Sequence, residues 1–129
     1  MGPHDQQLTT TISRACLRRW GKSSFEDSFL AEMKEMENDL PLDEMCGSRG
    51  YRPHGSWVEF EDLKFSKTNP PYAEGSFHVS FIGEMNGGCR DNPGKFGISG
   101  RLFFQLHLRS GEIAFDTPQD YSDYGHESD

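Results

Sequence analysis

The chain has 129 residues, a formal net charge of −8 at neutral pH and three cysteines. This length suits one domain with a hydrophobic core of its own. Its apolar runs are far shorter than the roughly 18 residues of a membrane-spanning helix, so no membrane partner is expected. The first twenty residues contain no apolar stretch typical of a secretory signal peptide.

The cysteines predict free thiols in a reducing compartment. Cys16, Cys46 and Cys89 are widely and irregularly spaced, without the C-x-x-C pairs typical of zinc ligands. Together with the missing signal peptide, this pattern predicts a cytoplasmic protein without a metal or other cofactor. One disulfide with one spare thiol is the alternative.

The charges are distributed unevenly along the chain. Residues 1–22 carry four basic groups and one acid, whereas residues 23–45 carry eight acids and one lysine. Nucleic acid requires a basic face, so it is not expected as a partner. An acidic surface favours a basic protein partner, because opposite charges steer association.

Two helices are predicted toward the N-terminus. The first is a basic helical segment within residues 1–22, although three consecutive threonines weaken its first turn. Apolar residues recur there every four positions, at Leu8, Ile12, Cys16 and Trp20. The second is an acidic helix over residues 24–40, with Ser24 and Asp27 as an approximate capping box and Pro41 as its end. Its apolar stripe consists of Phe25, Phe29, Met33, Met36 and Leu40.

A loop over residues 41–56 leads into an antiparallel sheet over residues 57–116, in which apolar and polar residues alternate. The alternation changes phase near residues 61–62, which predicts a β-bulge there. Phe77 and Phe104 are predicted to pair on the covered face. This register sets large residues opposite glycines on neighbouring rungs.

The order of these elements predicts an α+β fold in a single domain over residues 1–129. Two N-terminal helices pack on one face of a curved, four-stranded antiparallel meander, and an acidic tail follows over residues 117–129. Phe29 or Met33 of the acidic helix is expected to contact the Phe77/Phe104 face, because each apolar surface is the largest one available to the other.

The second face of the sheet is predicted to carry polar side chains that could line a ligand pocket. The candidates are His78, Arg101, Phe103 and His107. A histidine beside a carboxylate suits general acid–base catalysis. An antiparallel sheet with one face in water carries polar residues there in any case. A solvated face, a binding face and a catalytic face therefore all stay open as interpretations.

Carboxylates form the other candidate site. On the acidic helix they are Glu32, Glu35, Glu37 and Asp39, and in the tail they are Asp120 and Asp123, beside Tyr121 and Tyr124. Repeated like charge destabilises a helix, a cost that a basic partner would offset. Aromatic rings beside carboxylates suit recognition of Arg or Lys. A solvated helix face is the simpler interpretation.

The sequence therefore predicts a small acidic binding protein or immunity-like inhibitor, rather than an enzyme, that engages a basic protein partner through its carboxylates. The alternative is a cone-shaped small-molecule-binding or enzymatic domain with a pocket on the polar sheet face. The two hypotheses differ in which face of the sheet the helices cover.

Overall fold

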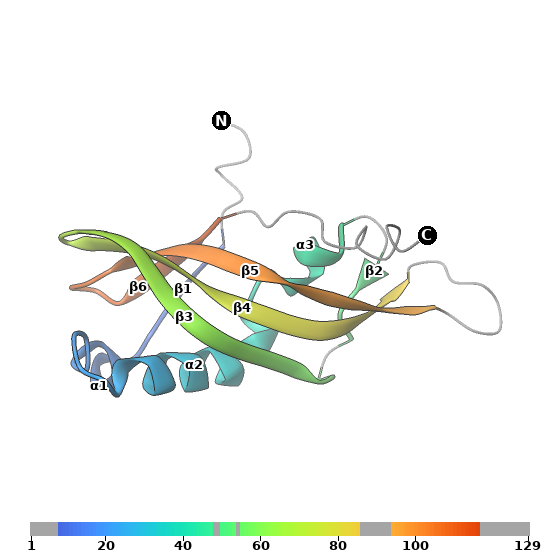
Figure 1. The fold of residues 1–129 in the computed structure, drawn as a ribbon, viewed down its shortest axis with the longest axis horizontal. Coiled ribbons are helices and arrows are strands. Elements are labelled where there is room, and N and C mark those ends of the chain that lie inside the picture. The colour runs from blue at the N-terminus through green and yellow to red at the C-terminus, as the bar shows by residue number, and fades with distance from the viewer. Residues whose placement is uncertain (1–7, 48–49, 54, 86–93, 117–129) are drawn as a thin grey trace.

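The computed structural model describes residues 8–47, 50–53, 55–85 and 94–116. They form an α+β fold built on an antiparallel sheet (Figure 1). The elements in chain order are β1 (Thr9–Thr11), α1 (Arg14–Leu17), α2 (Phe25–Glu35), the 3-10 helix η2 (Glu37–Asp39), α3 (Leu42–Cys46), β2 (Gly50–Tyr51), β3 (Val58–Asn69), β4 (Tyr72–Met85), β5 (Lys95–His107) and β6 (Glu112–Phe115).

The sheet has six strands rather than the predicted four. Its order is β1-β6-β5-β4-β2, and β3 also pairs with β4. Strands β3 and β2 share one edge of β4, with β3 beside residues 72–81 and β2 beside residues 84–85. The three long strands β3, β4 and β5 form the body of the sheet, and the short strands lie at its ends (Figure 1).

The predicted first helix is mostly wrong. Thr9–Thr11 form strand β1, which pairs with β6, and α1 covers only Arg14–Leu17. Three β-branched residues in a row favour a strand once a partner strand is present. Three of the four residues of the apolar stripe still face the core, because Ile12 and Cys16 are buried and Trp20 packs edge-on against Phe25 and Phe65, whereas Leu8 is exposed.

The predicted acidic helix is present but shorter than residues 24–40. Helix α2 ends at Glu35, η2 follows, and Leu40 is extended and buried ahead of Pro41. The predicted capping box does not form, because Ser24 has helical backbone angles and its side chain makes no cap hydrogen bond. Its hydroxyl instead accepts a hydrogen bond of 3.1 Å from Arg19.

The predicted bulge in β3 is confirmed. Glu61 pairs with His78 and Lys64 with Ser76, so two residues of β3 lie opposite Phe77 alone. One of them, Asp62, has a φ of 59°, in the left-handed region that non-glycine residues seldom adopt. The extra residue brings Leu63 onto the covered face, where it packs against the core.

The predicted register between β4 and β5 is wrong by two residues. Phe77 pairs with Leu102, and Phe104 pairs with Gly75. Large side chains still lie opposite glycines across the two strands, since Gly83 lies opposite Phe96 and Gly100 lies opposite Val79. A shift of two residues preserves the side-chain faces, because the period of a strand is two.

The helices cover the Phe77/Phe104 face, as predicted. Phe29 of α2 stacks on Phe104 with ring centroids 5.2 Å apart, and its ring lies 5.9 Å from that of Phe77. The buried residues of α1, α2 and α3 all belong to one core cluster with the inner residues of the strands. In the part of the chain that is described, the opposite face of the sheet is therefore open.

Candidate binding face

The open face of the sheet is organised in cross-strand rows. Ile82 of β4 lies opposite Gly97 of β5, and Ser80 lies opposite Ser99 and Glu59. In the next row His78 lies between Glu61 of β3 and Arg101 of β5. Phe103 lies one row further along, and His107, opposite Tyr72, two rows beyond that.

Three of the four predicted ligand residues therefore lie in one row or the row next to it, and one does not. His78 and Arg101 share a row, Phe103 is adjacent, and His107 stands apart. The Nδ1 atom of His107 accepts backbone N–H groups of Arg109 and Ser110, each at 3.2 Å, so it stabilises the turn after β5.

Arg101 is engaged by its own chain rather than aimed outward. Its Nε donates to Ser76 Oγ and its Nη1 to Asp62 Oδ2, both at 2.9 Å. The hydrogen bond from Arg101 to the Asp62 carboxylate holds the pKa of that carboxyl below its usual value. The guanidinium also donates to the backbone oxygen of Asp62. Arg101 thus supports the strained residue at the β3 bulge.

Ser99, His78 and Glu61 form a line across β5, β4 and β3. Ser99 Oγ lies 2.9 Å from His78 Nε2, and His78 Nδ1 lies 3.7 Å from Glu61 Oε2. Hydroxyl, imidazole and carboxylate follow in the order of a nucleophile, a base and an orienting group. Sequence reasoning missed this array, because the contact between Ser99 and His78 is diagonal and depends on the register.

An apolar hollow lies at one end of the open face. Its volume is about 460 Å³, and it is lined by Pro53, Ser56, Trp57, Ile82, Glu84 and Lys95. Trp57 and Ile82 are 56% and 41% exposed. Gly97 lies opposite Ile82, and a Cβ atom there would meet nothing within 4 Å. The position beside Ile82 therefore carries no side chain and is open to solvent.

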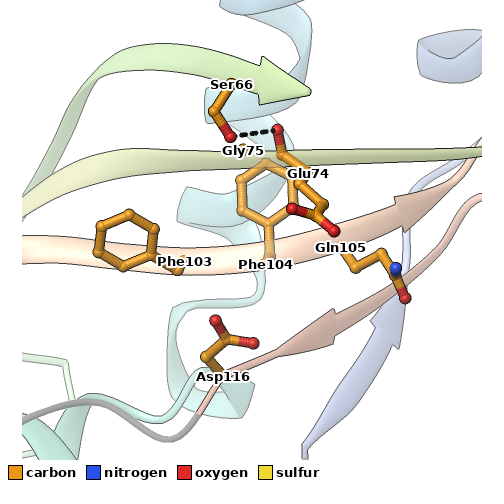
Figure 2. A pocket seen from close by; sticks show the side chains of 7 residues that line it. All are labelled: Ser66, Glu74, Gly75, Phe103, Phe104, Gln105 and Asp116. Atoms are coloured by element: carbon orange, nitrogen blue, oxygen red, sulfur yellow. Dashed lines mark hydrogen bonds between the residues drawn. The ribbon is translucent and has the colours of Figure 1, made fainter. Parts of the chain in front are cut away.

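An acidic hollow of about 240 Å³ lies further along β5. Figure 2 shows its lining residues, which are Ser66, Glu74, Gly75, Phe103, Phe104, Gln105 and Asp116. The backbone N–H of Asp116 donates to the carbonyl oxygen of Phe103 at 2.9 Å, which holds the backbone of Asp116 beside that of the exposed Phe103.

The two carboxylates of this hollow repel each other. Partial burial, and then the charge of Glu74, raise the pKa of the Asp116 carboxyl above its usual value. Lys67 stands opposite Glu74 in the β3–β4 register. Even so, no Lys, Arg or His of the described residues forms an ion pair with either carboxylate. A cation bound in the hollow would relieve this repulsion.

The predicted carboxylates of the acidic helix have divided roles. Glu32 accepts hydrogen bonds from the backbone N–H of Ser13, at 2.8 Å, and from its hydroxyl. Glu37 pairs with the buried Arg52 at 3.3 Å. Glu35 and Asp39 are exposed. The predicted tail residues Asp120, Tyr121, Asp123 and Tyr124 lie outside the described residues.

Large exposed apolar side chains gather on the open face. The described residues contain six of them, which are Leu8, Tyr51, Trp57, Tyr72, Ile82 and Phe103. All except Leu8 belong to this face, since Tyr51 pairs with Glu84, Tyr72 pairs with His107, and Trp57 lines the same hollow as Ile82. Apolar side chains concentrated on one surface are typical of an interaction site.

Comparison of the chain with known protein families, curated proteins and solved structures found no match. Within the described residues, no cluster of three or more His, Cys, Asp or Glu side chains could hold a metal ion. Among the helices of those same residues, none is long and apolar enough to cross a membrane. Cys16 is a buried free thiol, Cys46 is also buried, and Cys89 lies outside the described residues.

Proposed function

We propose that this protein is a binding protein that docks a partner bearing basic side chains on the open face of its sheet. One observation carries the proposal: five of the six large apolar side chains left exposed among the described residues belong to this one face. The helices already cover the other face, so folding of the described chain does not account for that exposure.

The charges of the face indicate the chemistry of the partner. Exposed carboxylates stand between the apolar side chains, at Glu59, Glu61, Glu74 and Asp116. An Arg side chain seated on the Phe103 ring would gain a cation–π contact and pair with the carboxylates of Glu74 and Asp116. An inhibitor that occupies the surface of a basic enzyme is the narrower form of this proposal.

The sequence also predicts carboxylates of the acidic helix as a contact for a basic partner. Two of them can be neutralised as a control for the two carboxylates of the acidic hollow. A fluorescent octa-arginine peptide serves as the probe, with binding measured by anisotropy at low salt. The double variant Glu74→Gln/Asp116→Asn should weaken binding about tenfold, because it removes two carboxylates that converge on one site. The double variant Glu35→Gln/Asp39→Asn removes the same formal charge from the helix and should have a smaller effect.

Two results would contradict the proposal. One is equal weakening by both double variants, which would indicate attraction by net charge alone. The other is a wild-type protein that does not bind the basic probe at low salt.

A second candidate function, ester or amide hydrolysis, rests on the Ser99–His78–Glu61 array. Neither hollow described above includes Ser99 or His78 in its lining, so nothing there holds a substrate over the hydroxyl. A pocket enzyme on this face would need an enclosed cavity beside His78 or His107, and neither histidine lines either of these two hollows.

A fluorophosphonate probe tests this second candidate. The Ser99 oxygen would attack phosphorus, its proton would pass to His78 Nε2, and fluoride would leave. Intact-mass measurement should then find one adduct on the wild type that is absent from Ser99→Ala and His78→Gln. A wild type without an adduct would reject hydrolysis by this array.

A further inference from the structure

We propose that the docked partner segment is an extended peptide lying along β5, with one basic and one apolar side chain six residues apart. This inference rests on the proposed function and deepens it. The acidic hollow beside Phe103 receives the basic side chain, and the apolar hollow beside Ile82 receives the apolar one.

The spacing follows from the register of the sheet. Ile82, which lines the apolar hollow, lies opposite Gly97, and Phe103 itself lines the acidic hollow. Gly97 and Phe103 are six residues apart on one strand and face the same side. Strand geometry of about 3.3 Å per residue places Gly97, at the near edge of the apolar hollow, roughly 20 Å from Phe103, at the near edge of the acidic hollow.

An extended peptide matches this distance and orientation. Its side chains alternate between two sides, so residues six apart point the same way and are separated by about 20 Å. A helix rises only about 1.5 Å per residue and would need roughly 13 residues to span the same distance. A peptide with anchors five residues apart would turn one of them away from the sheet.

The two hollows differ in what they accept. Trp57, Pro53 and Ile82 give the first an apolar wall, which suits a side chain such as Leu, Ile or Met. In the second, Glu74 and Asp116 share the lining with the aromatic ring of Phe103, and a planar guanidinium suits such a site better than an ammonium group.

The surface between the hollows is polar. The row of Glu61, His78 and Arg101 crosses it next to Phe103, and a row with two serines lies nearer to Gly97. Ser80 and Ser99 face each other there, with Glu59 beside them on β3. Small hydroxyl side chains let a peptide backbone approach closely and can exchange hydrogen bonds with its polar groups.

Synthetic peptides of nine residues test the two-anchor arrangement. Each consists of Ser and Thr with one Arg and one Leu, placed six or five residues apart and in either order. In anisotropy measurements at low salt, a six-spaced peptide should bind about tenfold more tightly than both five-spaced peptides, because only six residues let both anchors insert. Replacing its Leu by Ser should remove that advantage.

Protein variants identify the hollow that each anchor uses. Trp57→Ala should abolish the preference for six-residue spacing, whereas Glu74→Gln/Asp116→Asn should weaken every peptide that contains Arg. Tyr72→Ala removes an exposed aromatic side chain of the same face that lines neither hollow, and it should leave the preference intact.

The outcomes separate this inference from the function on which it rests. Equal binding of the six-spaced and five-spaced peptides, still lost in Glu74→Gln/Asp116→Asn, would overturn the two-anchor arrangement and leave the basic-partner proposal standing. Failure of every peptide and of octa-arginine to bind the wild type would overturn both. A spacing preference that survives Trp57→Ala would overturn the assignment of the apolar hollow.

Discussion

Phe103 and Phe104 are adjacent in the sequence but occupy opposite faces of β5. Phe104 is 3% exposed and stacks on Phe29, whereas Phe103 is 50% exposed at the acidic hollow. Phe104→Ala should therefore lower the free energy of unfolding by about 3–5 kcal/mol, through lost apolar burial and the cavity left behind. Phe103→Ala should lower it by roughly 0.5 kcal/mol or less, as surface substitutions usually do.

Urea unfolding of both variants and the wild type checks this prediction. If Phe103→Ala were the more destabilising change, the helices would have to cover the polar face instead. The open face would then be a protein interior, and both the binding proposal and the two-anchor arrangement would fail.

Asp116 provides a second test at the residue scale, through pH. Its pKa is raised in the folded state, first by burial and then by Glu74, so the folded protein holds this proton more tightly than the unfolded chain. Stability linked to Asp116 therefore falls as the pH rises from its unfolded pKa through its folded pKa, and stays lower above both values.

The variant Asp116→Asn should accordingly be more stable than the wild type at neutral pH. This advantage should shrink as the pH falls through the folded pKa of Asp116 and vanish below the unfolded pKa. Urea unfolding at a series of pH values measures it, with Glu112→Gln on β6 as a control outside the hollow. An Asp116→Asn variant with no such pH dependence would contradict the repulsion between Asp116 and Glu74.

At the scale of elements, patterns local in the sequence were the reliable ones. The period-two alternation assigned the faces of β4 and β5 correctly, and its change of phase located the bulge opposite Phe77. The Phe25–Phe29–Met33 stripe likewise identified the buried side of α2. Each of these features depends on neighbours within one strand or helix.

Features that depend on distant pairing were missed. Thr9–Thr11 become a strand only because β6, about 100 residues later, supplies a partner, and β2 forms beside the end of β4. The candidate site has the same origin. Ser99 meets His78 through the register, and the acidic hollow draws Glu74 and Asp116 from different parts of the chain. No spacing within the sequence marks these contacts.

The register itself can be tested through two glycines. A Cβ atom on Gly75, opposite Phe104, would lie 2.6 Å from the carbonyl oxygen of Lys64 and 2.8 Å from the Phe65 ring. Gly75→Ala should thus push β3 and β4 apart and destabilise the protein by about 1–3 kcal/mol, the range of overpacking. Gly97→Ala meets nothing within 4 Å and should be neutral or stabilising by up to about 1 kcal/mol.

Thermal or urea unfolding of the two alanine variants gives the comparison directly. Equal stability of Gly75→Ala and Gly97→Ala would show that β3 does not press against Gly75. The pairing of Gly75 with Phe65 of β3 would then lose its main steric support.

At the scale of the whole molecule, several carboxylates of the acidic helical segment also form contacts within the protein. Glu26 accepts the backbone N–H of Leu63 at 3.1 Å, Glu32 binds Ser13, and Glu37 pairs with Arg52. Helix α2 thereby binds β3 and the start of α1, and η2 binds the segment before β3. These contacts offset part of the repulsion along the helix, and Glu35 and Asp39 remain exposed for long-range attraction.

This division of roles predicts different kinetics for the two pairs of carboxylates. Exposed charges outside a contact act mainly on the association rate, whereas charges within a contact act mainly on dissociation. In stopped-flow measurements with octa-arginine, Glu35→Gln/Asp39→Asn should slow association and flatten its dependence on salt, because fewer charges attract the peptide over the Debye length of about 8 Å. Glu74→Gln/Asp116→Asn should chiefly raise the dissociation rate, about tenfold. The reverse assignment, with Glu35 and Asp39 controlling dissociation, would move the docking surface from the open sheet face to α2 and η2.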